Sequence, residues 1–354
     1  NCYDGQRMQV YRQIPFDSTS LSEDYITALY EDSQQRLWVG TTNGLNCYQF
    51  SSGTFRRIPQ LKTVIKAITE DKSHVLWVGT EAGWWTLKPN ETILKSTKES
   101  PNDAKKQLSA KLTLLLPAQT MISALLTDRL GVVWAGTHGQ GIFRFRFDAA
   151  SQEYMLLDTF EEDFFDKNGL KSSHITCLYE GHEANEDVVW VGTREAGVQM
   201  YSRSKNTFRH WERLFTKEPV GSRNFFGITT DKRGYLWAGT FSHLYRIDRK
   251  TRDIRPYTVA PNTVIETTLE DSYGRFWAGG NNGLYRYDYA NERFTSFHLP
   301  PYEEHNPWVF RIFEDGRRDI WIGTRGYLAN IKPSGETEIW KELPSTKNNK
   351  IKLR

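Results

Sequence analysis

Short apolar runs alternate with polar turns along almost the whole chain. In the first clear unit the apolar runs ITALYE, LWVGT and LNCYQF are separated by the polar turns DSQQR and TNG, and a third turn, SSG, leads to FRRI. Runs of this length between turns that contain Asn, Gly and Ser predict short antiparallel strands joined by hairpins. The unit therefore predicts a meander of four strands.

The same pattern occurs seven times, and each copy carries one tryptophan in its second predicted strand. The phrase reads LWVGT, LWVGT, VWAGT, VWVGT, LWAGT, FWAGG and IWIGT. Its tryptophans are Trp38, Trp77, Trp134, Trp190, Trp237, Trp277 and Trp321. They lie roughly 40 to 57 residues apart, which is close to the period of propeller blades. Since four strands make one blade, the sequence predicts an all-β fold, a seven-bladed β-propeller of four-stranded antiparallel blades.

The N-terminal segment leaves eight blades as an alternative. NCYDGQRMQVYRQIP aligns with NCYQFSSGTFRRIP of the first unit, so residues 1–15 resemble the last two strands of a blade without its first half. They would either close the ring on the last blade or form half of an eighth blade. We expect seven blades in a single domain over residues 1–354. Because the chain begins at Asn1 without a signal-like segment, we expect a mature or excised part of a longer protein.

An aspartate recurs in the turn before most of the tryptophans. An aspartate precedes the tryptophan by six positions in six units, at Asp32, Asp71, Asp128, Asp231, Asp271 and Asp315. Such a carboxylate is expected to accept backbone N–H groups, and Gly131, Gly234 and Gly274 would provide positive φ in three of these turns. In the fourth unit Gly181 replaces the aspartate and HEANED lengthens the turn. We expect the tryptophans to fill the gaps between blades, and the glycine after them to let backbones approach closely.

Charge and composition exclude several partners. The chain has 46 basic and 43 acidic residues, a net charge of +3, and no long apolar run. We therefore expect no nucleic-acid partner and no membrane-spanning segment in this domain. Cys2, Cys47 and Cys177 lack metal-ligand spacing, and so do the eight histidines, so no metal site and no cofactor are expected.

The repeats resemble the two-component regulator propeller family. The pattern I-x-x-L-x-E-D-x-x-G-x-L-W-x-G-T-x-x-G-L-x-x-Y-D is nearly complete in YEDSQQRLWVGTTNGLNCY and in LEDSYGRFWAGGNNGLYRYD, and the resemblance covers about residues 1–343. The long insert after the second tryptophan and the phrases GTFSHLYRID and GTRGYLANIKP depart from it.

The resemblance implies a function as well as a fold. In this family the propeller is a periplasmic ligand-binding module of hybrid two-component systems and sensor histidine kinases of glycan-degrading gut bacteria. It implies a non-enzymatic sensor for a glycan or oligosaccharide breakdown product. It also implies a periplasmic location, a membrane-anchored parent protein that is a histidine kinase, and a homodimer formed through that parent.

Two alternatives remain open. The chain has no GxSxG, HExxH or Walker phrase, but a polysaccharide lyase or glycoside hydrolase needs only a few facing side chains. A protein-docking scaffold would instead present a flat apolar face. The aspartate turn resembles the Asp-box of sialidases, although there the aspartate lies one residue nearer the tryptophan. The acidic stretch Glu161–Leu170 does not complete a calcium loop.

The candidate ligand site is the mouth of the propeller, where two variable positions recur in each unit. Four residues after each tryptophan come Thr42, Glu81, His138, Arg194, Phe241, Asn281 and Arg325. At the start of each inner strand come Tyr25, Val64, Met121, His174, Asn224, Val264 and Trp308. From these sets we predict ligand contacts by His138, Arg194, Phe241, Asn281, Arg325, Tyr25, His174, Asn224 and Trp308. The aliphatic members of the second set are expected to be core, aromatic members would stack on sugar faces, and Arg and Asn would bind hydroxyls or a uronate carboxylate.

Long blade-joining segments are expected on the same face. They are residues 89–119, 158–173, 213–223 and 299–307. Segments of this length are usually functional or mobile. Part of the first one is expected to supply the outer strand of the second blade.

Overall fold

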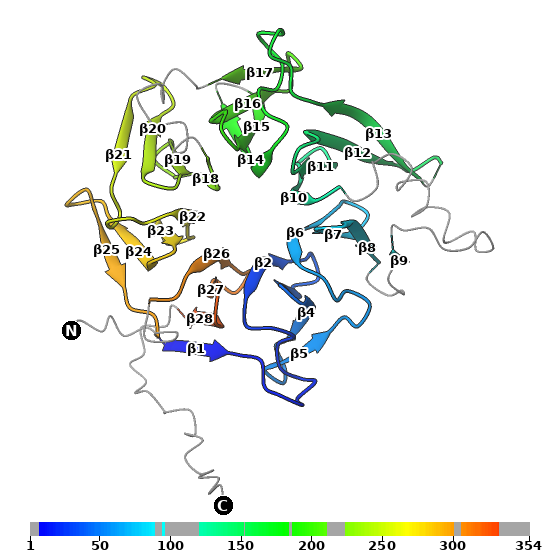
Figure 1. Ribbon diagram of the computed structural model, residues 1–354, viewed down its shortest axis with the longest axis vertical. Helices are drawn as coiled ribbons and strands as arrows, with labels where there is room; N and C mark the ends of the chain where they lie inside the picture. Colours follow the sequence, from blue (N-terminus) through cyan, green and yellow to red (C-terminus); the bar gives the residue numbers. More distant parts are fainter. Residues whose placement is uncertain are drawn as a thin grey trace, which may run out of the picture.

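The computed structural model describes residues 7–88, 94–95, 120–151, 153–183, 186–210, 224–300 and 306–332. Within this part of the chain, all regular structure is β-strand, and the strands form seven four-stranded antiparallel sheets arranged as blades around one axis (Figure 1). The predicted seven-bladed propeller is confirmed. No helix of the described residues is long and apolar enough to cross a bilayer.

Each blade runs from an inner strand at the axis to an outer strand at the rim (Figure 1). The inner strands are β2 (Ile26–Glu31), β6 (Ile65–Glu70), β10 (Ile122–Thr127), β14 (Ile175–Glu183), β18 (Gly227–Thr230), β22 (Ile265–Glu270) and β26 (Val309–Glu314). The second strands are β3 (Leu37–Thr41), β7 (Leu76–Thr80), β11 (Val132–Thr137), β15 (Glu186–Thr193), β19 (Tyr235–Gly239), β23 (Phe276–Gly280) and β27 (Ile320–Thr324). The third strands are β4 (Gly44–Gln49), β8 (Gly83–Leu87), β12 (Ile142–Asp148), β16 (Val198–Ser202), β20 (Leu244–Asp248), β24 (Gly283–Asp288) and β28 (Leu328–Lys332). The outer strands are β5 (Thr54–Arg57), β9 (Leu94–Lys95), β13 (Glu153–Phe160), β17 (Thr207–His210), β21 (Ile254–Tyr257), β25 (Arg293–Phe297) and β1 (Arg7–Tyr11).

Strand β1 closes the ring. It pairs antiparallel with β28, from Arg7 opposite Lys332 to Tyr11 opposite Leu328. The last blade therefore takes its outer strand from the beginning of the chain, which is the ring-closing arrangement and not half of an eighth blade. The second blade takes β9 from the insert, where Lys95 pairs with Trp85.

The aspartate turns fold as expected and do one thing more. The Asp271 carboxylate is fully buried, and it accepts the backbone N–H groups of Tyr273 and Arg275 at 3.0 and 2.9 Å. It also accepts the indole N–H of Trp277 at 2.9 Å. Among the described residues the same indole bond joins six aspartate–tryptophan pairs, at distances of 2.7 to 2.9 Å. The carboxylate thus fixes both the turn and the orientation of the blade's largest side chain.

Neighbouring blades interlock through one apolar side chain, which we call the knob. The knobs are Ile26, Ile65, Ile122, Ile175, Phe225, Ile265 and Val309, all at most 1% exposed. Most knobs sit against the glycine that follows the tryptophan in the preceding blade. A Cβ on Gly136 would lie 2.6 Å from Ile175 Cγ2, and one on Gly279 would lie 2.5 Å from Val309 Cγ1. The predicted close approach is therefore made by a side chain of the next blade, for which glycine leaves the space.

The two ends of the propeller differ. We call the end where the inner strands begin the mouth face, and the end that carries the aspartate turns the Asp-turn face. On the Asp-turn face, backbone N–H groups after the aspartate donate to a glutamate of the next blade. Within the described residues these bonds are Ser33 to Glu70, Arg129 to Glu180, Lys232 to Glu270, Ser272 to Glu314 and Gly316 to Glu31, at 2.6 to 3.1 Å. On this face, the loop hydrogen bonds therefore join neighbouring blades.

Candidate functional site

The two variable sets of the sequence meet on the mouth face. In five described blades the backbone N–H four residues after the tryptophan donates to the carbonyl at the start of the inner strand. The pairs are Thr42 with Tyr25, His138 with Met121, Arg194 with His174, Asn281 with Val264 and Arg325 with Trp308, at 2.9 to 3.3 Å. Variable side chains of both sets are thereby held side by side around the axis.

A bulge in the inner strand adds a third variable position to this face. The register of the first two strands shifts immediately after the knob in six described blades. The bulged residues are Thr27, Lys66, Ser123, Thr176, Glu266 and Phe310, and Phe226 holds the equivalent position in the fifth blade. A bulge redirects the side chain of the extra residue. Each of these side chains is half-buried, so it is positioned by the fold and still reachable.

The sequence prediction missed this third set. The signal was present, because the residue after the knob varies from Thr to Lys to Phe while its neighbours keep a template. A bulge has no residue signature of its own, however. Alternation along a regular strand would have assigned these side chains to a blade interface.

Three aromatic rings stack at the junction of the last and first blades. The ring of Phe310 lies 4.7 Å from that of Tyr25, with 24° between their planes. It lies 5.1 Å from Trp308, with 17° between planes. Two predicted contacts, Tyr25 and Trp308, are thus brought together by a residue that was not predicted. All three side chains are half-buried, so part of the stack faces solvent.

Histidines and arginine gather on the opposite side of the axis. The rings of His138 and His174 meet edge to face with centroids 4.8 Å apart. Burial, His174, Arg194 and Lys66 lower the pKa of His138, which places these four side chains within electrostatic reach of one another. Lys66 is paired with Glu81 at 3.0 Å. The remaining predicted aromatic contact, Phe241, is exposed and packs edge to face on Phe226 at 4.9 Å.

The two predicted asparagines hold backbone on this face. Asn224 is buried, and its amide oxygen accepts the Glu195 N–H at 2.9 Å. The amide oxygen of Asn281 accepts the Val264 N–H at 2.8 Å, and its amide nitrogen donates to the Asn262 carbonyl at 3.2 Å. Both amides already have structural partners, so they shape the mouth face.

One acid and two arginines lie near the aromatic stack. Burial raises the pKa of Glu266, which lies near Arg311 and Trp308. Burial also lowers the pKa of Arg311, against the attraction of Glu266. Arg311 and Arg325 both act electrostatically on the hydroxyl of Tyr25. The mouth face therefore combines aromatic surface, two guanidinium groups and one carboxylate at a single junction.

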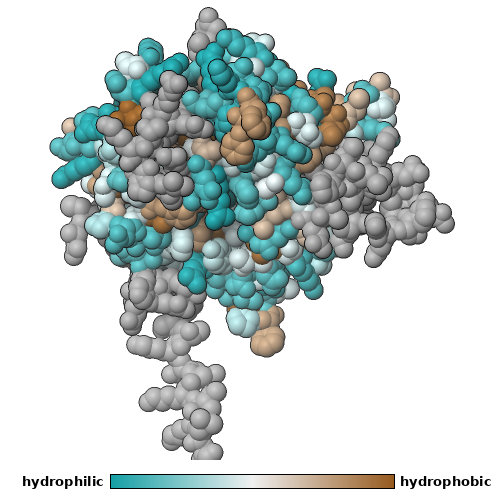
Figure 2. Space-filling view, turned by 45° about the horizontal axis from the view of Figure 1, so that its top comes forward, coloured by the Kyte–Doolittle hydropathy of each residue, from teal (hydrophilic) through white to brown (hydrophobic). Residues whose placement is uncertain are grey.

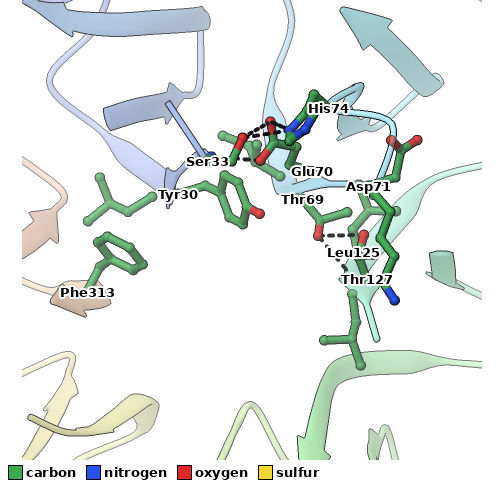
Figure 3. Close-up of a pocket in the computed structure, with 13 residues that line it drawn as sticks. Tyr30, Ser33, Thr69, Glu70, Asp71, His74, Leu125, Thr127 and Phe313 are labelled. Atoms are coloured by element: carbon green, nitrogen blue, oxygen red, sulfur yellow. Dashed lines mark hydrogen bonds and ion pairs between the residues drawn. The ribbon is translucent and has the colours of Figure 1, made fainter. Parts of the chain in front are cut away.

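A described pocket lies at the other end of the axis. It has a volume of about 600 Å³ and is lined by β2, β6, β10 and β26, including Tyr30, Thr69, Thr127 and Phe313 (Figure 3). The Thr69 hydroxyl donates to that of Thr127 at 3.0 Å. Thr127 occupies the position that is glutamate in five other blades, and the shorter side chain leaves space at this junction. None of the predicted ligand contacts lines this pocket.

Among the described residues, no group of three or more His, Cys, Asp or Glu side chains is arranged to hold a metal ion.

Figure 2 shows a mainly hydrophilic surface with small, separate apolar groups on the face in view. Of the predicted long segments, residues 89–119 and 213–223 lie outside the described residues except for β9, as do residues 301–305. Segment 158–173 is described, and there the Lys171 ammonium donates to the Asp163 and Asp166 carbonyls at 2.7 and 2.6 Å.

Comparisons with known proteins agree with the repeat. Residues 20–43 match the family model described as "Two component regulator propeller", which confirms the resemblance. No curated protein sequence matches the chain.

Solved structures of similar fold come from different kinds of protein. Two are extracellular domains of proteins described as hybrid two component systems from B. thetaiotaomicron. Their TM-scores are 0.68 and 0.66 at 18% and 19% identity, over 93% and 92% of this chain and 42% and 39% of theirs. A third is virginiamycin B lyase from Staphylococcus aureus, with a TM-score of 0.65, 13% identity, and coverage of 92% of this chain and 99% of that one. At these identities the likeness shows the fold, and this chain spans about two fifths of the first relatives.

Proposed function

We propose that this chain is the extracytoplasmic ligand-binding domain of a two-component signalling protein and that its ligand is a small glycan. The match to the two-component regulator propeller model supports the signalling role. So does the fold shared with extracellular domains of hybrid two component systems. A ligand that drives such a switch must bind one arrangement of the parent protein better than another.

The observation that carries the glycan proposal is the stack of Tyr25, Phe310 and Trp308. Sugar rings carry polarised C–H groups that pack well on the negative face of an aromatic ring. The stack lies at the end of the propeller where three variable positions meet, beside polar side chains that are able to bind hydroxyl groups. We place the glycan against this stack on the mouth face.

The test is titration calorimetry of the whole chain against neutral and acidic oligosaccharides of two to six sugars, with product release assayed in the same samples. We expect binding without turnover, and a loss of about tenfold or more in affinity in Trp308→Ala. The matched control is Tyr273→Ala, because Tyr273 is a 54% exposed aromatic residue on the Asp-turn face. Release of products would contradict the non-enzymatic sensor and indicate a lyase or a hydrolase instead. Binding that is unaffected by Trp308→Ala would move the site away from the mouth face, and no binding of any glycan would favour a docking role.

A further inference from the structure

One residue breaks the template of the inner strands. Two positions after the knob, six described blades carry a small side chain. They are Ala28, Ala67, Ala124, Cys177, Gly227 and Thr267. The seventh blade carries Arg311. Since six blades pack without a large side chain here, the fold does not require a guanidinium at this place.

Arg311 is half-buried and only partly satisfied. Its Nη1 donates to the Phe310 carbonyl at 2.7 Å. Glu266 of the adjacent blade attracts the guanidinium group. However, no carboxylate oxygen of the described residues lies within 4.0 Å of an Arg311 nitrogen, the distance of an ion pair. A guanidinium has five N–H donors. Most of the hydrogen-bonding capacity of Arg311 is therefore open to a ligand.

Two more arginines on the mouth face also lack an ion-pair partner among the described residues. Arg194 and Arg325 are exposed, and neither forms an ion pair with a described residue. Their backbone N–H groups are fixed to the carbonyls of His174 and Trp308, each at 2.9 Å. Their side chains therefore start from rigid positions, in contrast to Lys66, whose charge is already balanced by Glu81. Arg194, Arg311 and Arg325 are thus three guanidinium groups of this face that have no carboxylate partner among the described residues.

We propose that the mouth face binds an anionic sugar, with its carboxylate or sulfate group held by Arg311 and Arg325 and its ring on the stack of Tyr25, Phe310 and Trp308. Guanidinium groups bind planar or tetrahedral oxyanions through paired N–H donors. The stack and the two arginines lie at the same junction between the last and first blades, since the Arg311 guanidinium donates to the Phe310 carbonyl at 2.7 Å and the Arg325 backbone N–H donates to the Trp308 carbonyl at 2.9 Å. This inference rests on the proposed function and narrows its ligand class.

Acidification acts on this site in one direction. Protonation of Glu266, which faces Arg311, Trp308 and Tyr25, removes a negative charge near the bound anion. The carboxyl group of a uronate is acidic enough to stay ionised between about pH 5.5 and about pH 8. Affinity for an acidic sugar should therefore be higher at about pH 5.5 than at about pH 8.

The experiment is calorimetric titration of the whole chain with di- and trigalacturonate, with neutral galactose oligomers of the same length, and with galactose 6-sulfate. The variants are Arg311→Ala, Arg311→Lys and Arg325→Ala. Arg311→Ala should fold, because alanine is the residue of three other blades at this position, and its melting temperature checks this. The control is Arg293→Ala, an exposed arginine of the outer strand β25.

We expect an affinity for galacturonate that falls by about tenfold or more in Arg311→Ala, partly recovers in Arg311→Lys and is unchanged in Arg293→Ala. Raising the salt concentration should weaken it as well. Sulfated galactose that binds with the same dependence on Arg311 would assign the anion as sulfate, within the proposed class. If neutral oligomers bind as tightly as galacturonate and Arg311→Ala does not change the affinity, the proposal of an anionic ligand is wrong. The sensor proposal would still hold. Failure of every sugar to bind would contradict the sensor proposal itself.

Discussion

At the scale of the residue, the fold depends on buried carboxylates whose partners are local. The aspartate turns were predictable from sequence, because an aspartate beside a tight turn accepts backbone N–H groups. The bond from the carboxylate to the indole nitrogen, six residues later, was not predicted. It depends on the tryptophan ring turning back over its own turn, and this orientation is decided by packing against the next blade.

Removal of one such carboxylate should be costly. Asp271→Ala leaves the Trp277 indole N–H and the Arg275 guanidinium without their buried acceptor. We expect a loss of about 3 to 5 kcal/mol in the free energy of unfolding, measured by denaturant titration. Asp253→Ala is the control, because Asp253 is an exposed turn residue. A loss below about 1 kcal/mol would mean that the turn folds as well without the carboxylate.

The pH dependence of stability tests the acid of the mouth face. Burial raises the pKa of Glu266 above its ordinary value of 4.5, so the folded protein binds this proton more tightly than the unfolded chain does. Ionised Glu266 therefore costs stability, and the cost develops as the pH rises from about 4.5 through the folded pKa. Glu266→Gln should have a higher melting temperature than the wild type at pH 7.5, and the difference should disappear near pH 4.

Glu161→Gln is the matched control for that comparison, because Glu161 is exposed. It should leave the melting temperature unchanged at both pH values. If Glu266→Gln instead lowers the melting temperature at pH 7.5, attraction between Glu266 and Arg311 outweighs the desolvation of the carboxylate.

At the scale of the element, blades are held together by a repeated fit of knob and glycine. The sequence predicted that the glycine lets backbones approach closely, whereas in the structure an apolar side chain of the next blade occupies the space that the glycine leaves. The sequence did not indicate the partner, because the knob belongs to the next repeat, several tens of residues away. The pairing follows from the ring arrangement and cannot be derived from one repeat alone.

A double-mutant cycle measures this fit. In Gly136→Ala the new methyl group would meet Ile175 Cγ2 at 2.6 Å, so we expect a loss of about 1 to 3 kcal/mol. Ile175→Ala should cost about 2 to 5 kcal/mol. Combined, the two substitutions should cost less than the sum by at least about 0.5 kcal/mol, because the clash has no second partner. Strict additivity in urea titrations would show that the two positions do not interlock.

At the scale of the whole molecule, the sequence was most informative about what repeats and least informative about what does not. Blade number, strand order and the variable end of the ring followed from the period and the template. Tyr25 and Trp308 were predicted as separate contacts, but their union through Phe310 depends on a bulge. Arg311 was overlooked because it stands at a position that is small and structural in every other described blade.

Ring closure by β1 has a further consequence, which is best stated in the language of assembly symmetry. Each blade offers a knob on one side and a glycine with its tryptophan on the other, so the contact is head-to-tail. Head-to-tail contacts make a closed ring or an open filament, depending on whether the last unit meets the first. The chain is in this sense a cyclic oligomer of its own repeat, and β1 is the strand that seals it. Because β1 precedes the first blade in the chain and pairs with the third strand of the last blade, main-chain hydrogen bonds join the two ends of the ring. The ring therefore cannot open between its first and last blades unless β1 separates from β28.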